Sequence, residues 1–158
     1  MTGAGRSVGG WAASPDRVAP WALRLTPVSS ASSSVPTGVV ATARAFTAHA
    51  LAGVPDRTAA ADAVLLVSEL VANACQHAGG PDALQLVRRG RLLRIEVSDP
   101  SPRPPRLRRP YERPYRPGEQ GGFGLFLVDR LAVAWGWRPE GGGKTVWCDL
   151  RLRDPAPR

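Results

Sequence analysis

The sequence is poor in several residue types, and each shortage excludes a class of protein. Among 158 residues there are two cysteines, Cys75 and Cys148, and neither has the neighbours of a metal-binding cluster. We therefore expect buried free thiols in a reducing cytoplasm rather than a disulfide. No apolar run approaches the roughly 18–20 residues that cross a bilayer, and residues 1–20 lack the apolar core of a signal peptide. The expected location is cytoplasmic, without a membrane.

Lysine is the scarcest basic residue, since Lys144 is the only one beside 20 arginines. The net charge of +8 suggests a nucleic-acid partner, because basic surfaces release counterions from phosphate backbones. However, the bias of a GC-rich genome also produces abundant Arg, Ala, Gly and Pro, so the positive charge is weak evidence for binding. We therefore regard nucleic acid as an unlikely partner. Where arginine is the default, a single lysine indicates a position that needs a compact point charge.

Length and composition predict one globular domain, with 43% apolar and 22% charged residues. We expect a disordered tail at 1–20, the domain at 21–152 and a second tail at 153–158. Within the domain, residues 100–120 hold seven prolines and six arginines with little apolar surface to bury. Such an excursion predicts a lid or a partner-binding loop.

Hydrophobic periodicity predicts the order of elements in the domain. Helices are expected at 36–52, 56–78 and 125–132, and strands at 21–28, 83–87, 92–98, 134–139 and 144–152. The strands before and after Gly90 are expected to form an antiparallel hairpin. Together these elements predict an α/β two-layer sandwich, with helices on one face of a mixed, mostly antiparallel sheet.

Two polar side chains interrupt the apolar surface of the longest expected helix. Glu69 and Asn73 are four residues apart, so they project from one face about one turn apart. A carboxylate can act as a general base, and an amide oxygen can bind Mg²⁺ among phosphate oxygens. A solvated Glu and Asn would give the same pattern, and the spacing alone favours that interpretation. His77, one turn further on, could border phosphates, although a histidine at a helix end is more often structural.

Three further features suit a ligand site, and each also has an ordinary structural explanation. Asp99 ends a strand and could accept a hydrogen bond from an exocyclic amine, or simply begin a turn. Gly122 and Gly124 precede a helix, where backbone N–H groups can contact phosphates. Lys144 and Thr145 enter the last strand. The lysine could offset phosphate charge and the hydroxyl could join the aspartate around a base, or both could form a polar hairpin edge.

The order of these features resembles one family. Four stretches carry the likeness: SELVANACQHA (68–78), IEVSDPS (95–101), GGFGLFLVDRLA (121–132) and GGGKTVWCDL (141–150). They are similar to the GHKL ATP-binding domain, the Bergerat-type fold shared by gyrase-type, histidine-kinase and mismatch-repair ATPases. Within that group the chain looks most like the small bacterial anti-sigma-factor serine/threonine kinases. The resemblance covers nearly the whole expected domain.

This resemblance implies ATP and Mg²⁺ as cofactors and assigns roles to individual residues. Glu69 would be the base that activates the attacking hydroxyl, and Asn73 would hold Mg²⁺. Asp99 would recognise the adenine amine with the help of Thr145. The remaining cofactor-binding positions that it implies are Gly122, Gly124, Leu125 and Lys144.

The implied function is an anti-sigma factor that phosphorylates an anti-sigma antagonist and otherwise binds a sigma factor, with a homodimer left open. One departure from the family pattern is Ser101, which stands near Asp99 where the family has glycine. It keeps a second interpretation open, a non-catalytic, nucleotide-gated protein-binding module. A third, a nucleic-acid binder that uses the arginines of 100–120, is weaker because few aromatic residues accompany them.

Overall fold

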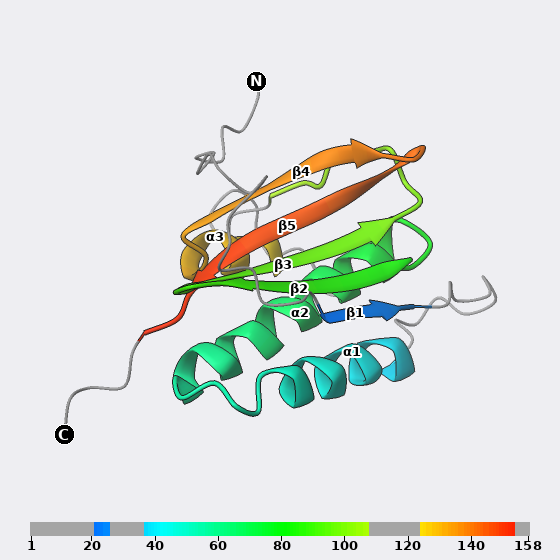
Figure 1. The fold of residues 1–158 in the computed structure, drawn as a ribbon. Helices are drawn as coiled ribbons and strands as arrows, with labels where there is room; N and C mark the ends of the chain where they lie inside the picture. Colours follow the sequence, from blue (N-terminus) through cyan, green and yellow to red (C-terminus); the bar gives the residue numbers. More distant parts are fainter. Residues whose placement is uncertain (1–20, 26–36, 108–123, 154–158) are drawn as a thin grey trace, which may run out of the picture.

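A computed structural model describes residues 21–25, 37–107 and 124–153. In this part of the chain an antiparallel sheet of five strands is covered on one face by three helices (Figure 1). The strand order is β1-β2-β3-β5-β4, and all four neighbouring pairs are antiparallel. The two-layer α/β prediction is confirmed, with a sheet that is antiparallel throughout the described strands.

The predicted elements are present with small shifts at their ends. In chain order they are β1 (Trp21–Arg24), α1 (Thr37–Ala50), α2 (Arg57–His77), β2 (Ala83–Arg89), β3 (Leu92–Asp99), α3 (Gly124–Leu131), β4 (Ala134–Glu140) and β5 (Gly143–Arg151). Four expectations fall wholly or mostly outside the described residues: the tails, the end of the first strand, most of the 100–120 segment and Gly122.

Helix α2 is the central helix, and it begins at a capping aspartate. The Asp56 side chain accepts a hydrogen bond from the Ala59 N–H at 3.0 Å, and this bond lowers the pKa of the carboxyl. The other carboxylate oxygen accepts a bond of 2.8 Å from the Arg153 N–H, just after β5. Asp56 therefore joins the start of α2 to the end of β5, although the two are far apart in sequence.

By length and composition alone, α2 could cross a membrane. A helix in the core of a soluble protein meets the same criterion, and one face of α2 is buried in the core. Its residues Ala63, Leu66, Val67 and Val71 are fully buried against the sheet and α1. The sheet contributes core residues at alternate positions on β2, β3 and β5: Leu84, Leu86, Leu93, Ile95, Val97, Val146, Cys148 and Leu150.

Both cysteines are free, as the sequence predicted. Cys148 is completely buried on the helical face of the sheet, and this burial raises the pKa of its thiol. Cys75 lies on α2 and is partly exposed, and desolvation raises its pKa as well. Both thiols are therefore neutral near pH 7, and neither has the lowered pKa of a catalytic cysteine.

The other face of the sheet is held by a buried ion pair. The Arg94 guanidinium on β3 donates two bonds to Asp149 on β5, at 2.7 and 2.8 Å. It also lies 4.2 Å from the centre of the Trp147 ring. Gly136 on β4 leaves room for that ring, because a Cβ there would come within 2.9 Å of it. These contacts fix the pairing of β3 with β5, and the ends of those two strands carry part of the candidate site.

Candidate functional site

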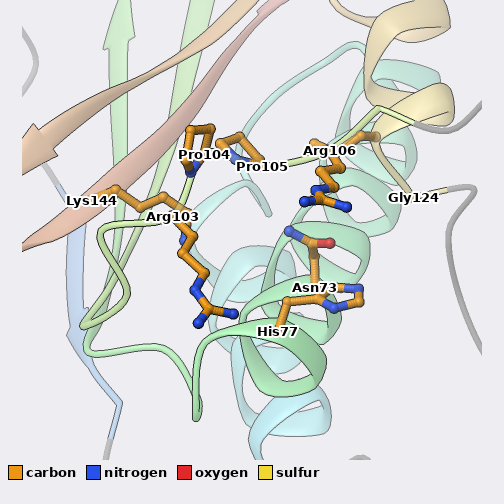
Figure 2. Close-up of a pocket in the computed structure, with 9 residues that line it drawn as sticks. Asn73, His77, Arg103, Pro104, Pro105, Arg106, Gly124 and Lys144 are labelled. Carbon is orange, nitrogen blue, oxygen red and sulfur yellow. The ribbon is translucent and has the colours of Figure 1, made fainter.

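A cavity of about 460 Å³ opens between α2, the start of α3, β5 and the segment after β3. Its volume lies within the range of about 300–1,000 Å³ that is usual for small-molecule sites. Figure 2 shows its lining, which comprises Asn73, His77, Arg103, Pro104, Pro105, Arg106, Gly124, Leu125 and Lys144. Four residues that the sequence singled out as cofactor-binding thus meet at one place: Asn73, Gly124, Leu125 and Lys144.

Asn73 and Glu69 lie on the same face of α2, as their spacing requires. Asn73 lines the cavity, whereas Glu69 lies behind Gly124 and does not belong to the lining. A Cβ at Gly124 would be 2.7 Å from Glu69 Oε2, so only glycine lets α3 start this close to the carboxylate. Glu69 is half-buried, and burial raises the pKa of its carboxyl. A raised pKa makes the carboxylate a stronger proton acceptor.

The cavity presents several groups that suit an anion. Arg103 and Arg106 are exposed, and in Figure 2 their side chains point toward α2, which carries Asn73 and His77. Guanidinium groups bind phosphate and carboxylate oxygens through pairs of N–H donors. The start of α3 adds backbone N–H groups and the positive end of the helix dipole. These donors make the cavity suitable for phosphate groups.

At its β5 side the cavity is lined by Lys144, which forms a buried ion pair with Asp99. Lys144 Nζ lies 2.8 Å from Asp99 Oδ1, and the two side chains are only 4% and 3% exposed. The ammonium also donates to the Ser101 carbonyl at 3.2 Å, and the Ser101 N–H donates to Asp99 Oδ1 at 2.9 Å. The register of the sheet explains the pair, because Asp99 and Lys144 are directly opposite on β3 and β5.

Thr145 lies on the other face of β5, since successive residues of a strand alternate. Its hydroxyl donates to Glu140, and it borders a second cavity of about 910 Å³ on the open side of the sheet. Three of the charged groups there are paired with one another, as Arg138 binds Glu96 at 3.1 Å and Glu140 at 3.4 Å. Lys144 lines both spaces, whereas Asp99 lines the second one. The first cavity is therefore the better candidate for a ligand site.

Two of the lining residues share a property that does not depend on any motif: each is the only residue of its type in the sequence. Asn73 is the only asparagine of the chain, just as Lys144 is the only lysine. In a composition that favours arginine, both rare side chains line one cavity. Arg103 and Arg106 gave a weaker signal, because six arginines occur in the 100–120 segment and the sequence does not say which of them reach the site.

The fold and the cavity define a class of protein: a small α/β sandwich with a cavity between its helices and one end of its sheet, lined by groups that suit an anion. The chain belongs to the histidine kinase-like ATPase domain family, whose match covers residues 32–149. That segment includes α1 through most of β5 and every residue of the cavity lining. A search of curated proteins gives no match. Membership of this family supports ATP as the ligand of the domain.

The cavity suits the phosphate end of such a nucleotide. An amide oxygen from Asn73 is a ligand type that Mg²⁺ accepts, and two arginines supply fixed positive charge. Gly124, at the start of α3, lines the same cavity, where backbone N–H groups can contact phosphates. Asp99, which the sequence predicts to contact the base, lies next to this cavity and is paired with the ammonium of Lys144.

Proposed function

We propose that this protein binds ATP with Mg²⁺ in the cavity beside α2 and acts as a cytoplasmic anti-sigma factor with serine/threonine kinase activity toward an anti-sigma antagonist. The observation that carries the proposal is the convergence of Asn73, the start of α3 and two arginines on one cavity in a histidine kinase-like ATPase domain. Phosphoryl transfer depends mainly on positioning and charge neutralisation, so this set of residues is sufficient for it.

In this proposal each side chain has a defined task. Asn73 holds the metal through its amide oxygen, and Arg103 and Arg106 bind the phosphate oxygens. ATP, when bound, supplies the phosphoryl group that is transferred, and Mg²⁺ offsets the charge on its oxygens. Glu69 accepts the proton of the substrate hydroxyl, a role for which its raised pKa suits it. Gly124 keeps the carboxylate close to the start of α3.

Calorimetric titration tests the binding half of the proposal. Wild-type protein should bind ATP in the presence of Mg²⁺, and Asn73→Ala should weaken that binding about tenfold, the effect of losing one interaction with a charged group. Gln85→Ala is a matched control, because Gln85 is an exposed amide on β2 outside this cavity. Equal affinity in wild type and Asn73→Ala would remove Asn73 from the site.

Phosphotransfer tests the catalytic half. With labelled ATP and an anti-sigma antagonist, wild type should label a serine or threonine of the antagonist. Glu69→Gln should bind ATP normally and transfer the label about 10²–10⁴ times more slowly, the usual contribution of a general base. Labelling at the wild-type rate by Glu69→Gln would exclude Glu69 as the base.

The buried Asp99–Lys144 pair favours a second candidate, a nucleotide-gated binding module without transfer. In that case ATP changes the affinity for a protein partner, and Glu69→Gln changes neither that affinity nor its response to ATP. A pull-down with sigma factor, with and without ATP, distinguishes the two candidates when it is combined with the phosphotransfer assay.

A further inference from the structure

The carboxylate that would recognise adenine is already engaged inside the protein. Within the described residues, Asp99 accepts two hydrogen bonds on Oδ1, from the Lys144 ammonium at 2.8 Å and from the Ser101 N–H at 2.9 Å. Both side chains of the ion pair are almost completely buried. The negative charge that would attract a donor on a base is therefore neutralised before any ligand arrives.

Lys144 is held firmly in this position. Its ammonium bridges two acceptors, the Asp99 carboxylate and the Ser101 carbonyl. The backbone just before it is tightly packed, since a Cβ at Gly143 would clash with the Asp99 carbonyl oxygen and approach the Pro100 Cα to 2.9 Å. The backbone that carries Lys144 is therefore fixed against the end of β3, and its ammonium is held there by two hydrogen bonds at a side chain that is only 4% exposed.

An adenine amine competes poorly for this carboxylate. A bond between an ammonium and a carboxylate is charge-assisted and about twice as strong as a bond between neutral groups. The exocyclic amine of adenine is neutral, so it cannot replace Lys144 without a net loss, and leaving the ammonium buried without its partner is unfavourable as well. The presence of lysine also fits the geometry, because a compact ammonium enters the gap between two close acceptors where the larger guanidinium does not.

The phosphate side of the cavity has no such restriction. Arg103 and Arg106 are exposed there, and Asn73 and the start of α3 face the same space. Building on the proposed function, we infer that Lys144 takes the place of the adenine amine at Asp99, so that the site holds nucleoside triphosphates mainly through their phosphates and discriminates weakly between bases. Lys144 is thus a specificity-determining residue, and its effect is to lower the preference for adenine.

Binding constants for different nucleotides test this inference without reference to turnover. The magnesium complexes of ATP, GTP and CTP are titrated into the wild-type protein, and their Kd values should agree within about threefold, less than one hydrogen bond to a charged group contributes. A wild-type preference for ATP over GTP of about 100-fold would overturn the inference and leave the proposed function standing. Absence of binding of all three triphosphates would overturn both.

A variant supplies the gain that the inference requires. Lys144→Thr removes the ammonium from the Asp99 carboxylate and introduces a hydroxyl opposite it, so the preference for ATP over GTP should rise about tenfold. Arg151→Thr is the matched control, since it removes one positive charge from an exposed position on β5 and should leave the preference unchanged. A selectivity in folded Lys144→Thr equal to that of wild type would contradict the inference.

The single lysine allows a measurement on unaltered protein. Labelling with ¹⁵N-lysine gives one side-chain ammonium signal, because the chain contains one lysine. On saturation with Mg²⁺–ATP this signal should remain protected from solvent exchange, as the pair with Asp99 persists. Loss of protection on binding would show that the nucleotide displaces Lys144, and the inference would then be wrong even if the variant failed to fold.

Discussion

Replacing Asp149 by asparagine should destabilise the protein strongly, because it removes the carboxylate charge that binds the buried Arg94 guanidinium through two hydrogen bonds. The carboxylate is completely buried and accepts two bonds, at 2.7 and 2.8 Å. Breaking a buried pair from one side generally costs about 3–5 kcal/mol. Arg94 keeps 11% of its side chain exposed and its contact with the Trp147 ring, so we expect the lower end of that range, about 3 kcal/mol.

Urea unfolding followed by tryptophan fluorescence measures this difference, and thermal unfolding should show a fall in Tm on the order of 10 °C. The control is Glu140→Gln, which removes a carboxylate charge from an ion pair that is 43% and 58% exposed. Exposed pairs of this kind contribute about 0–1 kcal/mol. If Asp149→Asn proved no more destabilising than Glu140→Gln, the pair would not be desolvated as the structure has it.

A double substitution separates the charge from the packing. Arg94→Met combined with Asp149→Leu removes both charges and fills the space with apolar groups, and such replacements are often neutral or stabilising. We expect the double variant to return to within about 1 kcal/mol of wild type. A double variant as unstable as Asp149→Asn would mean that the geometry of the pair, rather than the unpaired charge, is what the sheet requires.

Three further outcomes follow from the environment of single groups. Burial raises the pKa of Glu69, so the folded state binds the proton of this carboxyl more tightly than the unfolded state does. The stability that this provides below the ordinary glutamate pKa is lost as the pH rises through the raised value. Urea unfolding across that pH range should show this fall in the free energy of unfolding in wild type and not in Glu69→Gln. Gly124→Ala should displace the Glu69 carboxylate by steric contact and slow phosphotransfer about tenfold or more, whereas Gly38→Ala, where a Cβ meets nothing within 4 Å, should leave the rate unchanged. In a thiol-reactivity assay on native protein Cys75 should react, and Cys148 should react only after unfolding, because its thiol is buried and its pKa raised; simultaneous reaction of both would contradict the packing of β5.

Much of the fold could be predicted because its elements have clear local periodicity. Leu93, Ile95 and Val97 alternate with polar residues, and this pattern alone identifies β3 and its buried face. Helix α2 was equally clear from its apolar stripe and its capping aspartate. These signals depend only on neighbours in sequence, so no knowledge of the tertiary structure was required.

The partners of the charged residues could not be predicted in the same way. Lys144 meets Asp99, and Arg94 meets Asp149, through the register of β3 with β5, and those strands are far apart in sequence. A shift of one residue in that register would separate both pairs. The face of β5 on which Thr145 lies could be predicted from the sequence. The alternation that places Val146 and Cys148 in the core also places Thr145 on the opposite face from Lys144.

The position of β5 in the sheet has a consequence for synthesis of the protein. This strand is the last of the described strands in sequence, yet it lies between β3 and β4 (Figure 1). Until it has left the ribosome, β3 and β4 each present an unpaired edge, which is the kind of surface that pairs with other chains. Lys144 also arrives only with β5, so the nascent chain must protect its own sheet edges before its ligand site exists, and slow translation near the end of the domain would prolong that exposure.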